Sequence, residues 1–266
     1  MTIRLCIAGA TGWPGSALAR AVALAPDLEL VAAVSRTHAG KRLGDVLGEP
    51  RLNAVMDGTV VEALAKGCDV FFDYTKPDVA KGSALAALGA GAHVVVGTSG
   101  LSDSDYEEIE TSAIAAGRGV LAVGNFAITV VLLQRFAEIA ARYVPSWEVI
   151  DYAHAGKVDA PSGTAREIAH RLSKIRAPEI KVPIEQTAGV RETRGGEIAG
   201  SRVHSIRLPS FVISAEVIFG MPDQRLSMRH DSGSSAEPYV DGALLAIRKV
   251  GSFAGLRRGL DQVMDF

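Results

Sequence analysis

The sequence predicts an α/β protein in which a Rossmann-type doubly wound parallel sheet is joined to a second α/β domain with a mixed or antiparallel sheet. Short apolar runs alternate with helical patterns up to residue 123, as expected for parallel strands joined by crossover helices. A glycine-rich turn, GATGWPG, follows the first run. After residue 125 the strands are rich in β-branched residues and the turns are closely spaced, which favours an antiparallel or mixed sheet.

The strands of the first domain are predicted from apolar runs without polar alternation, a pattern typical of strands that helices cover on both faces. After the first run, the segment SALARAVAL has apolar residues spaced as on one face of a helix. Strand, tight turn and helix are therefore predicted in that order at the amino end. The predicted strands are residues 3–8, 28–34, 68–73, 92–96 and 119–123.

The second domain is predicted to open with a helix over residues 128–143 and to return to the first domain through a last helix over 239–250 and an apolar tail. Residues 176–200 are rich in proline, glycine and charge, which predicts a surface excursion or an active-site loop. The elements predicted between them are a strand at 147–153, a helix at 161–175, and strands at 201–208, 211–219 and 225–229.

Composition narrows the class of protein. The chain has 266 residues, a net charge of -2, 48% hydrophobic and 22% charged residues, which argues against disorder and against nucleic acid as the main partner. No run approaches the ~20 apolar residues of a membrane span, and no secretory signal opens the chain, so a cytoplasmic soluble protein is expected. Cys6 and Cys68 lie in apolar stretches, which predicts reduced core thiols and no metal site.

Glycine is the outlier of the composition, with 28 residues, and three of them form the pattern GxxGxxG at Gly9, Gly12 and Gly15. Between a strand and a helix, this pattern lets the backbone approach a pyrophosphate, and the amino end of the helix supplies unpaired N–H groups. Pro14 suits a first helical turn. We interpret the motif as a dinucleotide-binding turn. A purely structural turn is the alternative.

The end of the second predicted strand bears on the choice of coenzyme. A site selective for NAD places Asp or Glu there, whereas this chain has Ser35 and Arg36, with Lys41 and Arg42 close behind. A guanidinium can pair with a 2′-phosphate, so NADPH is the expected coenzyme, with NADH possible. Alternatively, Arg36 is an ordinary solvated loop residue.

Two further strand ends carry polar residues. Gly97, Thr98 and Ser99 follow the strand at 92–96 and can offer backbone groups to a nicotinamide, or they form an ordinary strand-to-helix turn. The stretch Asp73-Tyr74-Thr75 ends another strand. Because Asp78 after a proline resembles a helix start, we assign this stretch mostly to structure.

The densest polar cluster lies between residues 151 and 165. His154 and Lys157 stand at a strand end as two titratable groups, and Ser162-Gly163-Thr164 opens a helix whose N–H groups suit a carboxylate. This pattern predicts an anion-binding site beside two titratable side chains. The alternative is equally compatible with the residues: Ser162 is a plain N-cap with Glu167 in the first turn, and His154 and Lys157 are solvated.

Several motifs together resemble the 4-hydroxy-tetrahydrodipicolinate reductase (dihydrodipicolinate reductase) family of lysine biosynthesis. They are IAGATGWPG, FFDYTKPDV, VVVGTSGL, GNFAI, EVIDYAHAGKVDAPSGTA, RGGEIAG, HSIRLPSFVISAEVIFG and LSMRHDS, of which KVDAPSGTA is highly specific. The resemblance implies a dinucleotide-binding domain over 1–126 completed by 233–266. It also implies a substrate-binding and oligomerisation domain over 127–232, with hinges near 125–126 and 232–235, and a homotetramer.

By the same resemblance, the family's reaction is reduction of a cyclic imine by hydride transfer from NAD(P)H. Lys157 stands at the position of the implied proton source, with His154 beside it, and the substrate would contact both of them as well as Ser162, Gly163 and Thr164. The cofactor would contact Gly9, Ala10, Thr11, Gly12, Trp13, Pro14, Arg36, Gly97, Thr98, Ser99, Gly124, Asn125 and Phe126.

The chain departs from the family pattern at three positions. Ala153 replaces the first of two adjacent histidines, Gly156 stands where a histidine often precedes the lysine, and Ser235 stands near an expected arginine. Lost donors weaken a site for a dicarboxylate, because hydrogen bonds to charged groups contribute ~1.5–3 kcal/mol each. Two alternatives therefore stay open: the same chemistry on another imine or a carbonyl/amine pair, or a catalytically silent NADP-binding paralog.

Overall fold

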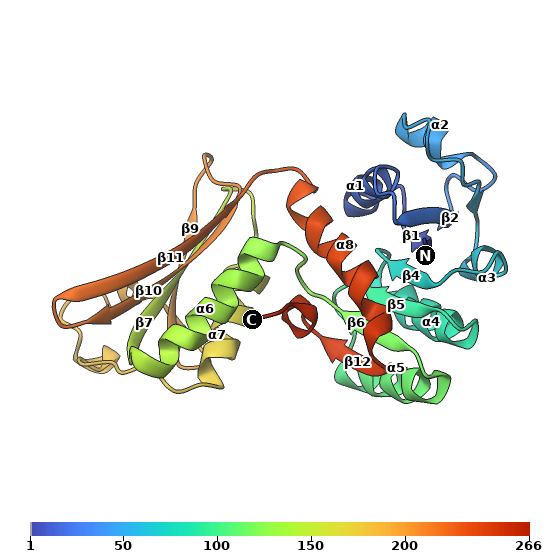
Figure 1. Cartoon of the computed structure of the whole chain (residues 1–266). Coiled ribbons are helices and arrows are strands. Elements are labelled where there is room, and N and C mark those ends of the chain that lie inside the picture. The colour runs from blue at the N-terminus through green and yellow to red at the C-terminus, as the bar shows by residue number, and fades with distance from the viewer. Residues whose placement is uncertain (1) are drawn as a thin grey trace. The chain divides into compact units, whose positions relative to one another are not determined.

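The computed structural model describes residues 2–266, which form two compact units (Figure 1). Unit 1 consists of residues 2–128 and Ala236–Phe266, and unit 2 of Thr129–Ser235. Met1, the first residue of the predicted dinucleotide-binding domain, lies outside the described residues. The chain thus passes from one unit to the other twice, close to the hinges that the family resemblance implies; motion at these points stays a prediction.

Unit 1 contains a parallel sheet in the order β12-β6-β5-β4-β1-β2-β3. The sequence order reverses between β1 and β4, which is the switch point where ligands bind in doubly wound sheets. The prediction of a Rossmann-type sheet is therefore confirmed. The strands are β1 (Ile3–Ala8), β2 (Leu28–Val34), β3 (Met56–Asp57), β4 (Val70–Asp73), β5 (His93–Val96), β6 (Gly119–Ala122) and β12 (Gly255–Arg258).

Helices lie on both faces of this sheet, because its strands are apolar on both sides. One face packs against α3, α4 and α5 through buried residues such as Phe71, Leu88 and Ile109. On the other face α1 and α8 lie together (Figure 1), and Arg248 of α8 pairs with Asp27 at 2.7 Å. The helices are α1 (Trp13–Val22), α2 (Leu43–Leu47), α3 (Val60–Leu64), α4 (Pro77–Gly89), α5 (Asp103–Ala116) and α8 (Val240–Lys249).

The two edge strands of this sheet, β3 and β12, are not among the strands predicted from the sequence. β3 has 2 residues, too few for a pattern. β12 reads GLRR, with Arg257 and Arg258 exposed, so it lacks the apolar run by which the other strands were found. Both cysteines are free thiols. Cys6 is fully buried in β1, whereas Cys68 is only partly buried at the edge of the same core.

Unit 2 contains a mixed sheet in the order β11-β10-β7-β9-β8, in which β7 and β9 are parallel and the other pairs are antiparallel. This confirms the prediction of a mixed or antiparallel sheet. β10 starts at residue 213, two residues later than predicted, because Phe211 N–H closes a turn onto Leu208 C=O (3.3 Å). The elements are α6 (Ile128–Tyr143), β7 (Ser146–Ala153), α7 (Gly163–Ser173), β8 (Gly196–Ile198), β9 (Ser201–Arg207), β10 (Ile213–Met221) and β11 (Gln224–Ser232).

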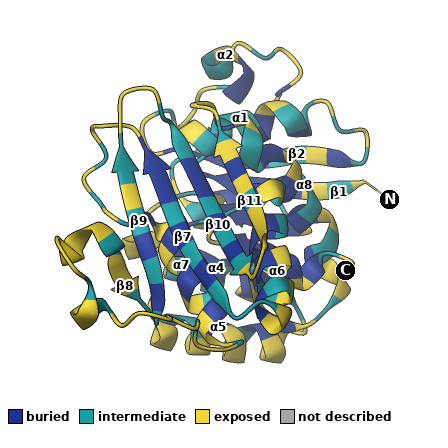
Figure 2. Ribbon diagram, turned by 90° about the vertical axis from the view of Figure 1, so that its left-hand side faces the viewer, coloured by how far each residue is buried: buried dark blue, intermediate teal, exposed yellow. Residues whose placement is uncertain are grey.

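Strand alternation gives this second sheet two different faces. Trp147 and Val149 of β7 point inward and pack with Ile168 and Leu172 of α7. The intervening positions, among them Glu148 and Ile150, belong to the opposite face, which is only partly buried (Figure 2). Residues 176–200 form a largely exposed excursion beside that face, with two 3-10 turns and β8 as its regular structure.

Among the helices of residues 2–266, none combines the length and the apolar character that crossing a bilayer requires. In the same range, His, Cys, Asp and Glu side chains form no group of three or more that is suited to a metal ion.

Candidate active site

The glycine turn of unit 1 is shaped by close backbone packing. Gly9 has φ +81°, and a Cβ there would overlap the carbonyl oxygen of Tyr74 at the end of β4. A Cβ on Gly15 would overlap the carbonyl of Gly9, so the helix could not approach the strand. Gly12 is exposed, with only the Gly9 carbonyl near its would-be Cβ, at 3.2 Å. Two of the three glycines therefore build the turn, and the third leaves it open to a ligand.

Of the described α-helices of unit 1, α1 alone has neither a side-chain cap nor an acidic residue in its first turn. Gly12 is its N-cap, no side chain caps it, and no acidic residue lies in its first turn. In contrast, α3 and α5 begin with capping boxes, Thr59 with Glu62 and Ser102 with Asp105. The α1 terminus therefore keeps unpaired N–H groups and a partial positive charge, as an anion-binding turn requires.

A cavity of about 720 Å³ lies against this turn. Of the predicted cofactor residues, Gly9, Thr11, Gly12 and Arg36 line it. Lys76, which the sequence analysis missed, lines it too and adds a second exposed cation. The available indication was that Lys76 lies between the end of the parallel strand β4 and the start of α4, where ligands bind in such sheets. The glycine turn, the open helix end and the cations fit the pyrophosphate and phosphate groups of a nicotinamide dinucleotide.

The end of β2 carries hydroxyl groups where an acidic residue would select NAD. Ser35 is buried, and its Oγ lies 3.1 Å from Thr11 Oγ1 and 3.4 Å from Thr37 Oγ1. Thr37 Oγ1 in turn lies 3.0 Å from His38 Nδ1. This network fixes the loop around the exposed Arg36 without placing a carboxylate beside it.

The sequence assigns the stretch Asp73-Tyr74-Thr75 mostly to structure; Asp73 does hold the ends of β4 and β5 together, whereas Tyr74 and Thr75 also line the 720 Å³ cavity. Its buried carboxylate accepts hydrogen bonds from Thr75 Oγ1 (2.9 Å) and Thr98 Oγ1 (2.5 Å). Burial raises the pKa of Asp73 despite these donors. Thr98 thus uses its hydroxyl to tie two strand ends together, and it leaves only its backbone for a cofactor. Ser99 is exposed, and Gly97 leaves room for the Tyr74 ring.

The remaining predicted cofactor residues do not line the 720 Å³ cavity. Ala10 is fully buried, and Trp13, 57% exposed, makes an edge contact with Tyr239. Phe126 is buried against Phe72 and Tyr74, with ring centroids 5.4 and 5.6 Å away. Pro14 lies in the first turn of α1, Asn125 Oδ1 accepts from Ala127 N–H at 2.9 Å, and Gly124 is exposed. Their cofactor contacts stay predictions.

In unit 2, the loop from β7 to α7 carries both predicted catalytic residues. Lys157 N–H donates to the His154 carbonyl (3.0 Å), so the two side chains leave one tight turn. The Lys157 Nζ lies 2.7 Å from Asp159 Oδ1 and is 23% exposed as a side chain, whereas His154 is exposed. The Lys157 ammonium holds the pKa of Asp159 below its usual range.

The start of α7 combines a structural cap with free donors. Ser162 is the N-cap, and its Oγ accepts from Ala165 N–H at 3.3 Å, as the structural alternative predicted. The same alternative placed Glu167 in the first turn, and this is wrong: Glu167 lies beyond that turn and pairs with Arg171 at 3.6 Å. Across residues 2–266, no acceptor is found for the N–H groups of Gly163 and Thr164. A Cβ on Gly163 would meet open space, so the chain's own packing does not require a glycine there.

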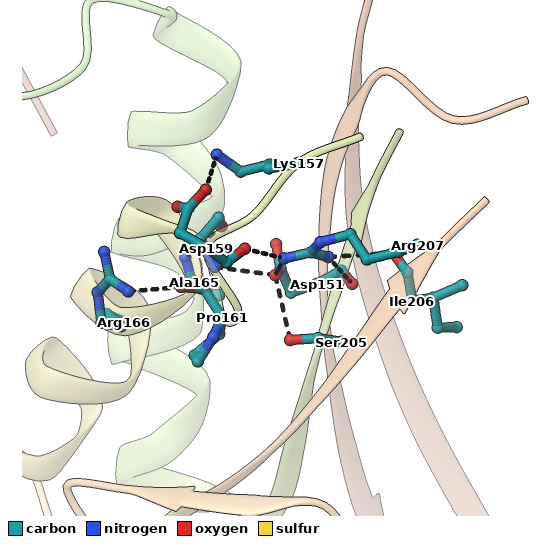
Figure 3. A network of polar contacts seen from close by, with 10 residues as sticks. Asp151, Lys157, Asp159, Pro161, Ala165, Arg166, Ser205, Ile206 and Arg207 are labelled. Atoms are coloured by element: carbon teal, nitrogen blue, oxygen red, sulfur yellow. Dashed lines mark hydrogen bonds and ion pairs between the residues drawn. The ribbon is translucent and has the colours of Figure 1, made fainter. Parts of the chain in front are cut away.

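A buried ion pair that the sequence analysis missed lies beneath this loop (Figure 3). Asp151 of β7 is fully buried, and its Oδ2 lies 2.7 Å from Arg207 Nη2 of β9. The same Oδ2 accepts from Ser162 N–H (2.9 Å) and Ser205 Oγ (3.3 Å), and Arg207 Nη2 also donates to the Asp159 carbonyl (2.7 Å). An aspartate at an inward position of an apolar strand was the available signal, because a buried charge demands a partner.

The three departures from the family pattern lie in different surroundings. Ala153 is fully buried at the end of β7, so a larger side chain at this position would have to fit into the core. Gly156 is exposed in the loop, with His154 Nδ1 3.4 Å from its would-be Cβ. Ser235 is exposed at the last residue of unit 2.

Comparisons with known proteins cover the whole chain. Residues 3–126 match the family model "Dihydrodipicolinate reductase, N-terminus", and residues 129–264 match that for the C-terminus. The 4-hydroxy-tetrahydrodipicolinate reductase of Desulfitobacterium hafniense is 35% identical over 265 residues, 99% of each chain. That of Nocardia farcinica is 39% identical over 268 residues, 100% of each chain.

A solved structure agrees. Dipicolinate-bound dihydrodipicolinate reductase from a Paenisporosarcina species matches with a TM-score of 0.88 and 28% identity, over 99% of this chain and 100% of that one. Because family models match both halves and relatives above 30% identity align over nearly its full length, the protein belongs to the dihydrodipicolinate reductase family of NAD(P)H-dependent oxidoreductases that act on a C=N bond.

Proposed function

We propose that the protein reduces the C=N bond of a cyclic imine, 4-hydroxy-tetrahydrodipicolinate, with NADPH as its preferred coenzyme. The observation that carries this proposal is the loop of unit 2, where the Lys157 ammonium precedes a helix start whose Gly163 and Thr164 N–H groups find no acceptor within residues 2–266. A substrate with a carboxylate and an imine nitrogen matches these two features, since one needs donors and the other needs a proton.

The reaction adds a hydride to the imine carbon and a proton to the imine nitrogen. The reduced nicotinamide, when bound, supplies the hydride. Lys157 donates the proton, and a positioned general acid of this kind contributes about 10²–10⁴-fold. Asp159, whose Oδ1 lies 2.7 Å from Nζ, orients the ammonium. His154 leaves the same turn, and we assign it to contact with the substrate.

The proposed preference for NADPH rests on unit 1. Arg36 and Lys76 present two exposed cations to the 720 Å³ cavity, and the end of β2 bears Ser35 in place of an acidic residue. A 2′-phosphate would gain charge-assisted hydrogen bonds from such groups. A ribose hydroxyl would gain much less, so NADH is expected to serve as a poorer coenzyme.

Ala153, Gly156 and Ser235 favour a second candidate, the same hydride chemistry on another cyclic imine or on a carbonyl with an amine. Each departure removes an imidazole or guanidinium donor that the family pattern places in this half of the chain. A chain with a changed set of donors selects a substrate with fewer or differently placed carboxylates.

The deciding experiment follows NADPH absorbance with freshly generated 4-hydroxy-tetrahydrodipicolinate and, in parallel, with a panel of cyclic imines and of ketones with ammonia. We expect turnover of the first substrate, a fall of about 10²–10⁴-fold in Lys157→Ala, and unchanged NADPH binding in that variant. The matched control is Lys174→Ala, because Lys174 is exposed at the end of α7.

Each other outcome selects an alternative. Turnover of a panel compound, with none of 4-hydroxy-tetrahydrodipicolinate, supports the second candidate. NADPH binding without turnover of any compound shows a catalytically silent paralog. Full activity in Lys157→Ala removes the lysine from the role of proton donor.

We also propose that the protein forms a homo-oligomer through the face of the unit 2 sheet opposite α6 and α7 (Figure 2). Ile150, Ile206 and Ile218 lie partly exposed on this face, which in an isolated chain leaves apolar surface in water. Sedimentation velocity is expected to give a multiple of the 27.9 kDa chain mass, and Ile218→Glu is expected to lower it. A monomer at micromolar concentration would contradict this proposal.

A further inference from the structure

The buried ion pair between Asp151 and Arg207 is not explained by its contribution to the stability of the fold alone. The two side chains are 0% and 16% exposed, and they join neighbouring parallel strands that already pair through their backbones. Removing two charges from water is costly, and buried ion pairs can often be replaced by apolar residues of similar volume without loss. The other contacts of the pair point to a role beyond holding β7 to β9.

Those contacts converge on the loop that carries Lys157 (Figure 3). Arg207 Nη2 donates to the Asp159 carbonyl at 2.7 Å, and Asp151 Oδ2 accepts from Ser162 N–H at 2.9 Å. The pair thus forms hydrogen bonds with the backbone at two points, one on each side of residues 160–161. The first point belongs to the residue whose carboxylate holds Lys157, and the second is the N-cap of α7.

A single guanidinium nitrogen, Arg207 Nη2, links the Asp151 carboxylate to the Asp159 carbonyl. Arg207 Nη2 lies 2.7 Å from Asp151 Oδ2 and 2.7 Å from the Asp159 carbonyl, so it cannot shift toward one without leaving the other. Asp159 in turn positions the Lys157 ammonium, because its carbonyl is bound by Arg207 while its Oδ1 lies 2.7 Å from Lys157 Nζ. Arg166 Nη1, from the first turn of α7, also donates to the Pro161 carbonyl at 2.6 Å and adds a further hydrogen bond to the loop.

We propose that Asp151 and Arg207 are positioning residues for the reduction, which fix the Lys157 ammonium relative to the N–H groups at the start of α7. The pair reaches neither substrate nor coenzyme in this role; it sets the geometry of groups that do. The proposal rests on the proposed function for the role of Lys157. It also gives the charged pair beneath this loop a purpose, because one nitrogen of the Arg207 guanidinium donates to the Asp151 carboxylate and to the Asp159 carbonyl at the same time.

The test compares Arg207→Met with the double variant Asp151→Asn/Arg207→Met. Arg207→Met strands a buried carboxylate, so it is expected to lower both the melting temperature and kcat. The double variant leaves no unpaired buried charge and is expected to recover most of the melting temperature. Because neither variant can grip the Asp159 carbonyl, both are expected to lose kcat on the order of 100-fold, with unchanged binding of NADPH.

A readout besides activity is amide hydrogen exchange. In both variants, exchange is expected to rise at residues 155–164 and to stay at the wild-type rate in α6 and in unit 1. Arg207→Lys, which keeps the charge but lacks the Nη2 nitrogen that reaches the Asp159 carbonyl, is expected to recover stability more than kcat. The matched control is Arg176→Met, which removes an exposed guanidinium 3.2 Å from Glu179 and leaves the loop untouched.

The outcomes separate this inference from the proposed function. Recovery of kcat together with stability in the double variant, or unchanged exchange at 155–164, would overturn the positioning role. Wild-type kcat in Lys157→Ala would instead overturn the proposed function, and the exchange data would still decide whether the pair holds the loop.

Discussion

The two units build their candidate sites by different means. In unit 1 the site is made by backbone shape: a glycine turn packed against β4, an uncapped helix start, and two exposed cations at the rim of a cavity. In unit 2 it is made by charged side chains, with a buried aspartate and arginine beneath a loop that bears a lysine. A site formed by backbone groups keeps its shape when most of its side chains are replaced. A site formed by paired charges loses its geometry when any one partner is removed.

Glycine shows the same contrast within single residues. Gly9 is required by the fold, because its φ of +81° and its contact with Tyr74 exclude a side chain. Gly163 is not required by the fold, because a Cβ there would enter open space. At the start of α7, this open space is where we place the substrate carboxylate.

The largest expected effect is that of Gly9→Val, which attacks the backbone-built site. A β-branched residue at positive φ costs about 1–3 kcal/mol, and its overlap with the Tyr74 carbonyl adds to that, so we expect a loss of about 3 kcal/mol or more of unfolding free energy. Urea titration measures the loss. Gly89→Ala, where nothing lies within 4 Å of the added Cβ, is the control and should cost nothing. Equal stability of the two variants would refute the packing argument.

Arg36→Ala tests whether side-chain charge also matters in unit 1. Loss of one charge-assisted contact to a 2′-phosphate corresponds to ~1.5–3 kcal/mol, so the Kd for NADPH should rise about 10- to 100-fold. The Kd for NADH should change less than about threefold, because that coenzyme lacks the phosphate. Isothermal titration calorimetry with both coenzymes gives the two values. Equal losses for both would show that Arg36 does not read the phosphate.

Gly163→Ala tests the opposite case in unit 2. Stability should stay the same or rise slightly, since alanine suits a helical turn better than glycine. The added methyl would stand where we place the substrate carboxylate, so the KM of the substrate should rise about tenfold, or ~1.4 kcal/mol. Steady-state kinetics and thermal unfolding of one preparation measure both effects. An unchanged KM would place the carboxylate elsewhere.

The smallest effect concerns Lys157 and Asp159 as an ion pair. Because the folded pKa of Asp159 is lowered, the pair's contribution to stability is present above the pKa of the unfolded carboxyl, about 4, and is lost as the pH falls through the folded value. In Lys157→Met the carboxyl should titrate at a higher pH than in the wild type, toward the ordinary range. Carbon NMR of the aspartate side chains follows this midpoint. An unchanged midpoint would show that Lys157 does not hold Asp159 in solution.

Much of the fold was predictable because its signals are local. Apolar runs located β1, β2, β4, β5 and β6, and helical spacing located α1 and α6. The edge strands β3 and β12 were missed because a very short strand, or one with exposed arginines, leaves no apolar pattern. Among the site residues, the glycine turn and the 154–164 loop were found from their motifs, whereas Lys76 was not.

The sequence by itself determined the parallel order of strand and helix, the turn at Gly9 to Gly15, and the presence of Lys157 before a helix start. These features depend on neighbours in the chain, so residue type and spacing reveal them. Only the tertiary structure decided that Asp151 meets Arg207, 56 residues away, and that this pair holds the carbonyl of Asp159. Such a contact depends on which strands lie side by side, and the parallel pairing of β7 with β9 across an intervening helix and loop cannot be inferred from the pattern of either strand alone.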